Sequence, residues 1–379
     1  MPFRESTIMA SREAFVREAV TEGANMRALC RAYGISPTTG YEWVARYRAY
    51  GEAGLYERPR RPATSPTRTS AEVEARVVAL RQEHPAWGGR KLHHRLRAVG
   101  FPAPPPSTCT EILRRHGLLD PERADRPRAL QRFTADAPNA LWQLDFKGGV
   151  QLAGRPAYPL HVIDDATRYL LAATLCPNQG FAAVQAVLRT LFAEMGLPER
   201  ILTDNGIPWS SPPTPGGLTR LSAWWVRLGI RVSHGRPFHP QTQGKVERSM
   251  RTVAAELFAA GSFPDAETLQ AALDHWRASY NTERPHEALD DHPPATVYHP
   301  SPRALPASLP PITYHPGDTV RMVSAPGVVS IKNRRIRISH ALIGEPVAFR
   351  PTPAEDIMTV HYCDHYLRTV DLRGPVRRR

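Results

Sequence analysis

The sequence is poor in cysteine and lysine and has no long apolar run. Its four cysteines are widely spaced and form no Cys-x-x-Cys pair, so neither a zinc ribbon nor a disulfide framework is supported. A reducing cytoplasm suits this usage. No apolar run approaches the roughly 20 residues of a membrane-spanning helix, and the N-terminus has no signal-peptide core. We therefore expect a cytoplasmic protein with no membrane partner.

Because lysine is scarce, arginine carries the basic charge. The net charge is +13, from 49 Lys and Arg against 36 Asp and Glu. Residues 1–130 carry 22 basic and 14 acidic side chains, residues 131–300 carry 15 and 16, and residues 301–379 carry 12 and 6. Basic ends around a near-neutral middle indicate that the ends hold a polyanion and the middle performs chemistry. An inert basic surface is the alternative.

Stretches rich in proline divide the 379 residues, a length that predicts two to four domains. Residues 51–69 and 120–135, which are also rich in arginine, and residues 301–316 are expected to be linkers. Arg60 and Arg61 in the first linker could follow DNA phosphates. The expected domains are helical over 1–50 and 70–119, α/β over 136–300, and a small β domain with a basic tail over 317–379.

Residues 1–50 show the pattern of three short helices. Ser11 and Asn25 are the expected caps of the first two helices, and Ser36-Pro37 opens the third. Two helices joined by a tight Gly-containing turn form a helix-turn-helix, whose last helix would enter a DNA major groove. A helical packing module without DNA contact is the alternative. Residues 70–119 resemble a second helix-turn-helix, in which His93-His94 has no partner at zinc spacing.

Residues 136–300 predict a mixed sheet with helices on both faces. The expected strands are 141–146, 158–163, 169–175, 200–203 and 231–233. The expected helices are 178–195, 218–228, 242 onward and 266–280. Short alternating runs over 317–372 predict a small antiparallel β-barrel with a hairpin turn at Lys332-Asn333-Arg334.

Three acidic residues in this α/β region stand in distinctive positions. Asp145 lies within a strand, Asp204 follows a strand, and Glu247 begins a helix. Gathered by the fold, three carboxylates would repel one another without cations. Hard oxygen ligands suit Mg²⁺ or Mn²⁺, and two such ions can clamp the attacking and leaving oxygens of a phosphodiester. Asp164 and Asp165 are rival acids, for which we expect a turn role.

The motifs Asp145, Asp204-Asn205-Gly206 and Gln243-Gly244-Lys245-x-Glu247 resemble the DDE catalytic core of bacterial insertion-sequence transposases. That core is similar to the retroviral integrase core and has an RNase H-like fold. The segment from Tyr280 to Leu289 also resembles the family. The chain departs from the family in the long spacing of 43 positions between Asp204 and Glu247, where residues 208–217 look like an inserted surface loop.

The resemblance implies a multidomain α and α/β protein, with helix-turn-helix modules, an RNase H-like core and a C-terminal antiparallel β domain. It implies a transposase that binds terminal inverted repeats and catalyses 3′-end cleavage and strand transfer. Asp145, Asp204 and Glu247 would be the catalytic residues and the ligands of two Mg²⁺ ions, which Mn²⁺ could replace. The partners would be double-stranded DNA and further copies of the chain, in the nucleoid.

Two other readings stay open. One is a sequence-specific DNA-binding regulator with an inactive core. The other is a transposase that needs a separate ATPase, since this chain has no Gly-x-x-x-x-Gly-Lys-Ser/Thr loop. In either case the expected DNA contacts are Thr38, Thr39, Tyr41, Arg46, Arg60, Arg61, Arg90, Lys91, Asn205, His239, Gln241, Gln243, Lys245 and Arg248.

Overall fold

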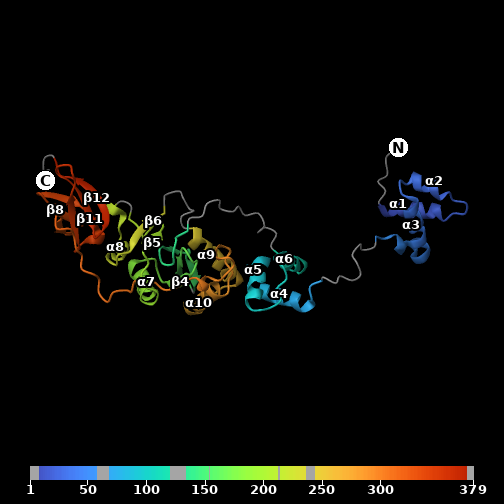
Figure 1. Ribbon diagram of the computed structural model, residues 1–379, viewed down its shortest axis with the longest axis horizontal. Coiled ribbons are helices and arrows are strands. Elements are labelled where there is room, and N and C mark those ends of the chain that lie inside the picture. Colours follow the sequence, from blue (N-terminus) through green and yellow to red (C-terminus); the bar gives the residue numbers. More distant parts are fainter. Residues whose placement is uncertain are drawn as a thin grey trace. The chain divides into compact units, whose positions relative to one another are not determined.

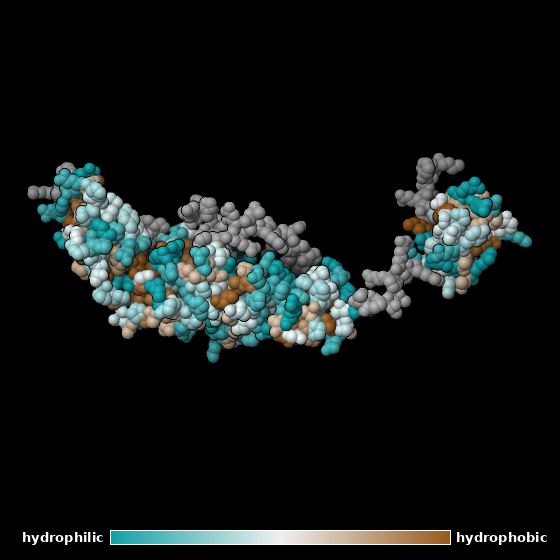
Figure 2. All heavy atoms as spheres, in the orientation of Figure 1, coloured by the Kyte–Doolittle hydropathy of each residue, from teal (hydrophilic) through white to brown (hydrophobic). Residues whose placement is uncertain are grey.

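The computed structural model describes residues 8–57, 68–119, 134–152, 154–211, 214–235 and 244–373. The chain divides into two compact units, Met1–Arg68 and Thr69–Arg379, whose elements are labelled in Figure 1. Apolar residues appear in Figure 2 as separate patches among hydrophilic ones, as expected for a folded surface. No helix within the described ranges is both long and apolar enough to cross a membrane.

The first unit is a bundle of three short helices. They are α1 (Ile8–Ala19), α2 (Met26–Ala32) and α3 (Pro37–Tyr50), followed by a 3₁₀ turn, η1 (Gly51–Leu55). Asn25 and Ser36 cap α2 and α3 as predicted, since each accepts a first-turn N–H. The predicted cap at Ser11 is wrong, because α1 already begins at Ile8.

Tight packing in this unit requires a glycine in α3. A Cβ on Gly40 would lie 2.5 Å from Cys30 Sγ and 2.9 Å from the Phe15 ring. The small residue therefore lets α3 approach α1 and α2, although glycine weakens a helix interior. Val44 completes the buried core, and Leu29 and Ile35 pack partly buried against it.

The second unit begins with α4 (Ala71–Glu83), α5 (Gly89–Ala98) and α6 (Pro106–Arg115). These helices match the prediction, and Ser70 caps α4. Their buried core is formed by residues such as Trp87, Leu92 and Ile112.

A six-stranded mixed sheet forms the centre of the second unit. Its strands are β1 (Trp142–Phe146), β2 (Val150–Leu152), β3 (Arg155–Asp164), β4 (Leu170–Cys176), β5 (Arg200–Thr203) and β6 (Arg231–His234). β3 pairs antiparallel with β1, β2 and β4, whereas β1–β5 and β5–β6 are parallel. β2 was not predicted, and the other strands lie where the alternation placed them.

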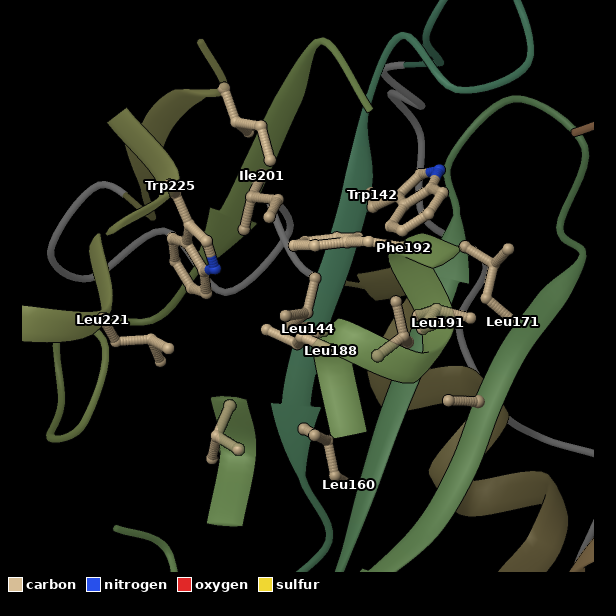
Figure 3. Close-up of a cluster of buried hydrophobic side chains, with 14 of the residues drawn as sticks. Trp142, Leu144, Leu160, Leu171, Leu188, Leu191, Phe192, Ile201, Leu221 and Trp225 are labelled. Atoms are coloured by element: carbon tan, nitrogen blue, oxygen red, sulfur yellow. The ribbon is translucent and has the colours of Figure 1, made fainter. Parts of the chain in front are cut away.

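Helices cover both faces of this sheet, as predicted. Trp142 and Leu144 of β1 point into a core with α7 (Phe181–Met195) and α8 (Arg220–Arg227), shown in Figure 3. The other face packs against α9 (Gly244–Glu256) and α10 (Ala266–Thr282). The 3₁₀ turns η5 (Phe258–Ala260), η6 (Glu287–Leu289) and η7 (Pro294–Thr296) surround this face. Asn178 does not cap α7, because its Oδ1 accepts from the N–H of Gly180, the residue before the helix.

The C-terminal domain consists of two antiparallel sheets. β7 (Thr319–Met322), β10 (Pro346–Pro351), β11 (Ile357–Tyr362) and β12 (His365–Asp371) form one, in the order β12-β11-β10-β7. β8 (Val328–Ile331) and β9 (Arg334–Arg337) form a hairpin, whose turn at Lys332-Asn333 was predicted. The 3₁₀ turn η8 (His340–Leu342) follows. These pairings do not close the predicted barrel among the described strands, and β10 and β12 were missed.

The C-terminal domain is packed onto the α/β core. Ala223 and Val226 of α8 belong to the hydrophobic core of the β domain, while Trp225 of the same helix belongs to that of the sheet. The predicted inserted loop takes part: in the 3₁₀ turn η3 (Pro215–Gly217), the Gly216 carbonyl lies 3.2 Å from His365 Nε2 on β12. The loop is therefore a docking element.

The predicted linker 301–316 is also attached to the core. The guanidinium of Arg303 donates to the carbonyl oxygens of Pro198 (2.7 Å), Leu228 (3.1 Å) and Gly229 (3.0 Å). Arg227 Nη2 donates to the Pro310 carbonyl at 2.8 Å. The segment thus runs along the core, tied to it by backbone-directed arginines.

Candidate active site

Asp145 lies near the end of β1, on the sheet face that α9 covers. Side chains alternate along a strand, so apolar Trp142 and Leu144 enter one core while Gln143 and Asp145 face the other side. Burial raises the pKa of Asp145 to about 6, the Phe146 N–H opposes this, and the charges of Asp204 and Glu247 also raise it. The three predicted carboxylates therefore share one electrostatic neighbourhood.

Asp204 directly follows β5, the parallel neighbour of β1. Its Oδ1 accepts a hydrogen bond of 2.9 Å from the N–H of Gly206, and its side chain is exposed. Asn205 Nδ2 donates to the Gly235 carbonyl at 2.7 Å, which ties this turn to the end of β6. Asn205, predicted to shape the turn and touch DNA, therefore has the first role here.

Glu247 lies in the first turn of α9. Its side chain is 39% exposed, and Oε2 lies 3.4 Å from Arg251 Nη2 one turn further on. A helix carries this acid, whereas a strand and a strand end carry the other two. The sequence predicted all three settings.

The three acids are neighbours but do not form a closed ligand set. Within the described ranges, no group of three His, Cys, Asp or Glu side chains is gathered closely enough to hold a metal ion. Each acid has a local partner: the N–H of Phe146 for Asp145, the N–H of Gly206 for Asp204, and Arg251 for Glu247. This separation is expected of like charges without a cation between them.

Lys245 occupies a different place from the predicted phosphate contact. Its Nζ forms an ion pair with Asp165 Oδ2, and its side chain is only 15% exposed. Burial lowers the pKa of Lys245 to about 8, although Asp165 opposes the shift. Asp165 was predicted to bond local backbone and Arg168, and instead accepts from Ala135 N, Gln143 and Lys245. Asp164 has the predicted turn role, accepting from the N–H and hydroxyl of Thr167.

The second helical module is docked on the core through Arg90, which was predicted to bind DNA, and through Arg95. Arg90 is paired with Asp291 at 2.7 Å and with Glu287 at 3.3 Å. Arg95 is paired with Glu283 at 2.8 Å. The guanidinium of Arg90 is thus engaged within the chain, and its assignment as a phosphate contact stays a prediction. Lys91, next to it, is half-buried.

Two further side chains contribute to the same interface. Trp87 Nε1 donates to Glu256 Oε1 on α9 at 3.2 Å, and His94 Nε2 lies 3.1 Å from Asp291. His93 Nδ1 lies 2.8 Å from the Pro104 carbonyl, within the helical module itself. Both histidines therefore make contacts within the chain.

The family-like segment after α9 is structural in this chain. Asn281 clamps β4, because its amide donates to the Leu170 carbonyl and accepts from the Leu170 N–H. Arg284 pairs with Glu256 beneath the module interface. These contacts hold α10 against the sheet.

The predicted groove-facing residues of α3 divide into two sets. Thr38 and Tyr41 are exposed, and Tyr41 is 59% accessible. Thr39 packs at the cap, with its hydroxyl 2.8 Å from Ser36 Oγ. Arg46 lies over the Trp43 ring at 4.2 Å and donates to the Tyr56 carbonyl. Arg248 is exposed beside Glu247, while Arg60, Arg61, His239, Gln241 and Gln243 lie outside the described residues.

Family models match each part of the chain. Residues 135–240 and 228–294 match integrase core domains, residues 11–63 a helix-turn-helix domain, and residues 39–113 a homeodomain-like domain. These matches define a class of protein with an integrase-type core and helix-turn-helix DNA-binding domains. Residues 318–375 match the C-terminal domain of IS481 family transposases. The chain therefore has the domain composition of an IS481-family transposase, which confirms the resemblance to insertion-sequence transposases.

Relatives come from insertion elements and retroviruses. The 39.2 kDa protein of insertion element IS476 from Xanthomonas euvesicatoria is 27% identical over 256 residues, covering 66% of this chain and 72% of the relative. The 31.7 kDa protein of insertion element IS407 from Burkholderia multivorans is 24% identical over 253 residues, covering 65% and 88%. The Gag-Pro-Pol polyprotein of Simian retrovirus SRV-2 is 35% identical over 112 residues, covering 30% and 6%.

Solved structures with some likeness are viral integrases. The catalytic core domain of HTLV-2 integrase in complex with magnesium has a TM-score of 0.34 at 15% identity, covering 43% of this chain and 99% of that one. The simian T-cell lymphotropic virus intasome in complex with a PP2A regulatory subunit has a TM-score of 0.39 at 16% identity, covering 79% and 99%.

Proposed function

We propose that this chain is a DDE-type DNA transposase that cleaves the 3′ ends of its mobile element and joins them to target DNA. One observation carries the proposal: the charges of Asp204 and Glu247 help to raise the pKa of Asp145. Acids from a strand end and a helix thus lie close enough to raise the pKa of an acid on a strand, although the three are 102 positions apart at their extremes. A carboxyl group perturbed in this way is a candidate for catalysis.

The donor set fits a hard divalent cation, because all three side chains offer carboxylate oxygens. Asp145, Asp204 and Glu247 would hold two Mg²⁺ ions, or Mn²⁺ in their place. When bound, such ions lower the pKa of the attacking hydroxyl group and neutralise the charge that develops on the phosphodiester. Asp145 gives the site a fixed strand position, while the exposed Asp204 can turn toward substrate.

Two successive displacements make up the proposed reaction. Water attacks the phosphorus atom at the element's 3′ end, and the bond from phosphorus to the 3′ oxygen breaks. The element then ends in a free 3′-hydroxyl, and the flanking strand carries the phosphate. That hydroxyl then attacks a target phosphodiester, forming the new bond as the target's own 3′ oxygen departs. No bond to the protein forms. Arg248, exposed beside Glu247, would contact a phosphate next to the reacting one.

DNA recognition is assigned to the helical domains. Thr38 and Tyr41 on the exposed side of α3 would face the major groove of a terminal repeat. Lys91 and the basic C-terminal domain would add contacts to phosphates, which position the protein without reading sequence. Joining two element ends to one target requires at least two copies of the chain on the DNA.

The test uses purified protein and DNA carrying the gene's own flanks. We expect nicking and joining in Mg²⁺, none in EDTA, and none for Glu247→Gln, whereas the exposed control Glu194→Gln stays active. Tight binding without cleavage, the same for Glu247→Gln, would contradict the proposal and favour a DNA-binding regulator. Cleavage that appears only when proteins encoded beside the gene are added would indicate a separate ATPase partner.

A further inference from the structure

The helix that carries Glu247 is fastened to the sheet at its first turn. First-turn N–H groups of a helix have no acceptor within the helix. Here the N–H of Val246 donates to Gln143 Oε1 at 3.2 Å. Gln143 is 1% exposed and lies two residues before Asp145 on β1. The strand of one catalytic acid therefore supplies a cap for the helix of another.

Asp165 connects this cap to Lys245. The Asp165 side chain is fully buried, and its Oδ1 accepts from Gln143 Nε2 at 2.7 Å. Its Oδ2 accepts from Ala135 N at 2.6 Å and pairs with Lys245 Nζ. A buried carboxylate is costly unless it is paired and hydrogen-bonded. These contacts therefore hold the first turn of α9 in the position where Lys245 Nζ can pair with the Asp165 carboxylate.

A second polar contact between α9 and the sheet lies just beyond Glu247. His161 on β3 is directly opposite Asp145 in the strand register. Its Nδ1 lies 3.1 Å from Ser249 Oγ on α9, and His161 is fully buried. The hydroxyl of Ser249 donates to the Val246 carbonyl at 2.7 Å, so His161 Nδ1–H is the donor in the first contact. Polar contacts to the sheet thus precede and follow Glu247 along α9.

We infer that Gln143, Asp165 and Lys245 are positioning residues that fix the first turn of α9, and with it Glu247, relative to Asp145. The inference rests on the proposed function, in which Asp145 and Glu247 bind the same metal ions. The Glu247 carboxylate is itself 39% exposed, so its place depends on the backbone that these residues hold. Outer contacts of this kind orient ligands and tune metal affinity.

The test compares full-length variants by two readouts. Asp165→Asn combined with Lys245→Met removes the pair without leaving a buried charge, Gln143→Leu removes the cap, and Lys245→Arg is the conservative variant. Arg231→Met, which breaks the exposed pair with Glu199 in the same core, is the matched control. Mn²⁺ binding is followed by electron paramagnetic resonance, hydrogen exchange is followed in the peptide spanning α9, and thermal melting confirms that each variant folds.

We expect the double variant and Gln143→Leu to bind Mn²⁺ about 10-fold more weakly and to exchange faster at the start of α9. Lys245→Arg and Arg231→Met should behave as the unaltered chain. Faster exchange with unchanged Mn²⁺ affinity, or no change in either readout, would overturn the positioning role. If the unaltered chain binds no Mn²⁺, the proposed metal site fails, and the exchange of α9 still decides whether these residues fasten it.

Discussion

Burial and the charges of two neighbouring carboxylates both raise the affinity of Asp145 for a proton. The pKa is raised from 3.8 to about 6, chiefly by burial. Because the folded chain then binds this proton more tightly than the unfolded chain, the contribution to stability is present below about pH 4 and is lost as the pH rises through about 6. A divalent cation competes with the same proton.

We predict that Asp145→Asn reduces the pH dependence of stability in the absence of divalent cations. Between pH 4 and 7.5, the unaltered chain should lose up to about 2 kcal/mol more stability than the variant. Urea unfolding in EDTA at several pH values measures this difference. The exposed Asp136→Asn is the control and should follow the unaltered chain. Parallel curves for Asp145→Asn and the unaltered chain would show that Asp145 keeps an ordinary proton affinity.

Single residues also show how far local sequence rules reach. The caps Asn25 and Ser36 were predicted because a cap bonds residues three positions away. The three acids proposed as catalytic could be singled out because each stands in a recognisable local motif. The partners of Lys245 and Arg90 were not, because Asp165 lies 80 positions from Lys245 and Asp291 lies 201 from Arg90. A basic residue therefore predicts charge, but only the fold decides whether DNA or the chain itself neutralises it.

At the scale of elements, α5 is held to the core by ion pairs that bridge distant parts of the chain. Arg95 and Glu283 are 24% and 35% exposed, so this pair alone is worth less than about 1 kcal/mol. The adjoining Trp87–Glu256 contact is nearly buried. Because this interface is polar, added salt should weaken it. Its specific contacts also set the orientation of α5.

We predict that Arg95→Glu increases hydrogen exchange in α5 and in residues 283–291, because like charges then face each other. Adding Glu283→Arg should restore protection, since the pair is re-formed with its charges exchanged. Hydrogen exchange with mass spectrometry measures both effects. Arg114→Glu, which disturbs a pair with Glu111 within α6, is the control. A double variant as unprotected as Arg95→Glu would contradict a role for this ion pair in docking.

The same scale explains which strands were missed. β10 begins and ends with proline, which usually argues against a central strand. Yet Val347, Ala348 and Phe349 between them are buried, and Ala348 and Phe349 pair with both β7 and β11. In β12 the buried apolar residues, Leu367 and Val370, are three positions apart, so the strict alternation that marks a strand is missing. In contrast, β1 and β3 lie in the centre of the sheet, and β4 pairs with β3. Most residues of these three strands are buried, which makes their apolar pattern plain.

At the scale of the whole molecule, the inserted loop and α8 join the catalytic core to the C-terminal domain. A Cβ on Gly216 would lie 2.6 Å from Leu367 Cδ2 on β12, whereas a Cβ on Gly217 would meet only Ser210 Oγ at 3.5 Å. Both glycines have positive φ, 71° and 67°. The two positions therefore share the same backbone cost for a side chain and differ in their closeness to the other domain.

We predict that Gly216→Ala destabilises the second unit by about 1–3 kcal/mol more than Gly217→Ala, because only the first overpacks the junction. Calorimetry of the full chain measures this, since the two compact units should melt separately and the transition of residues 8–57 should not move in either variant. Sheet and β domain share α8, and so we expect both to melt in the displaced transition. Equal losses for the two alanines would mean that backbone strain alone matters at this loop. A larger loss for Gly216→Ala would show that the loop after Asp204 anchors the C-terminal domain to the core through its contact with β12.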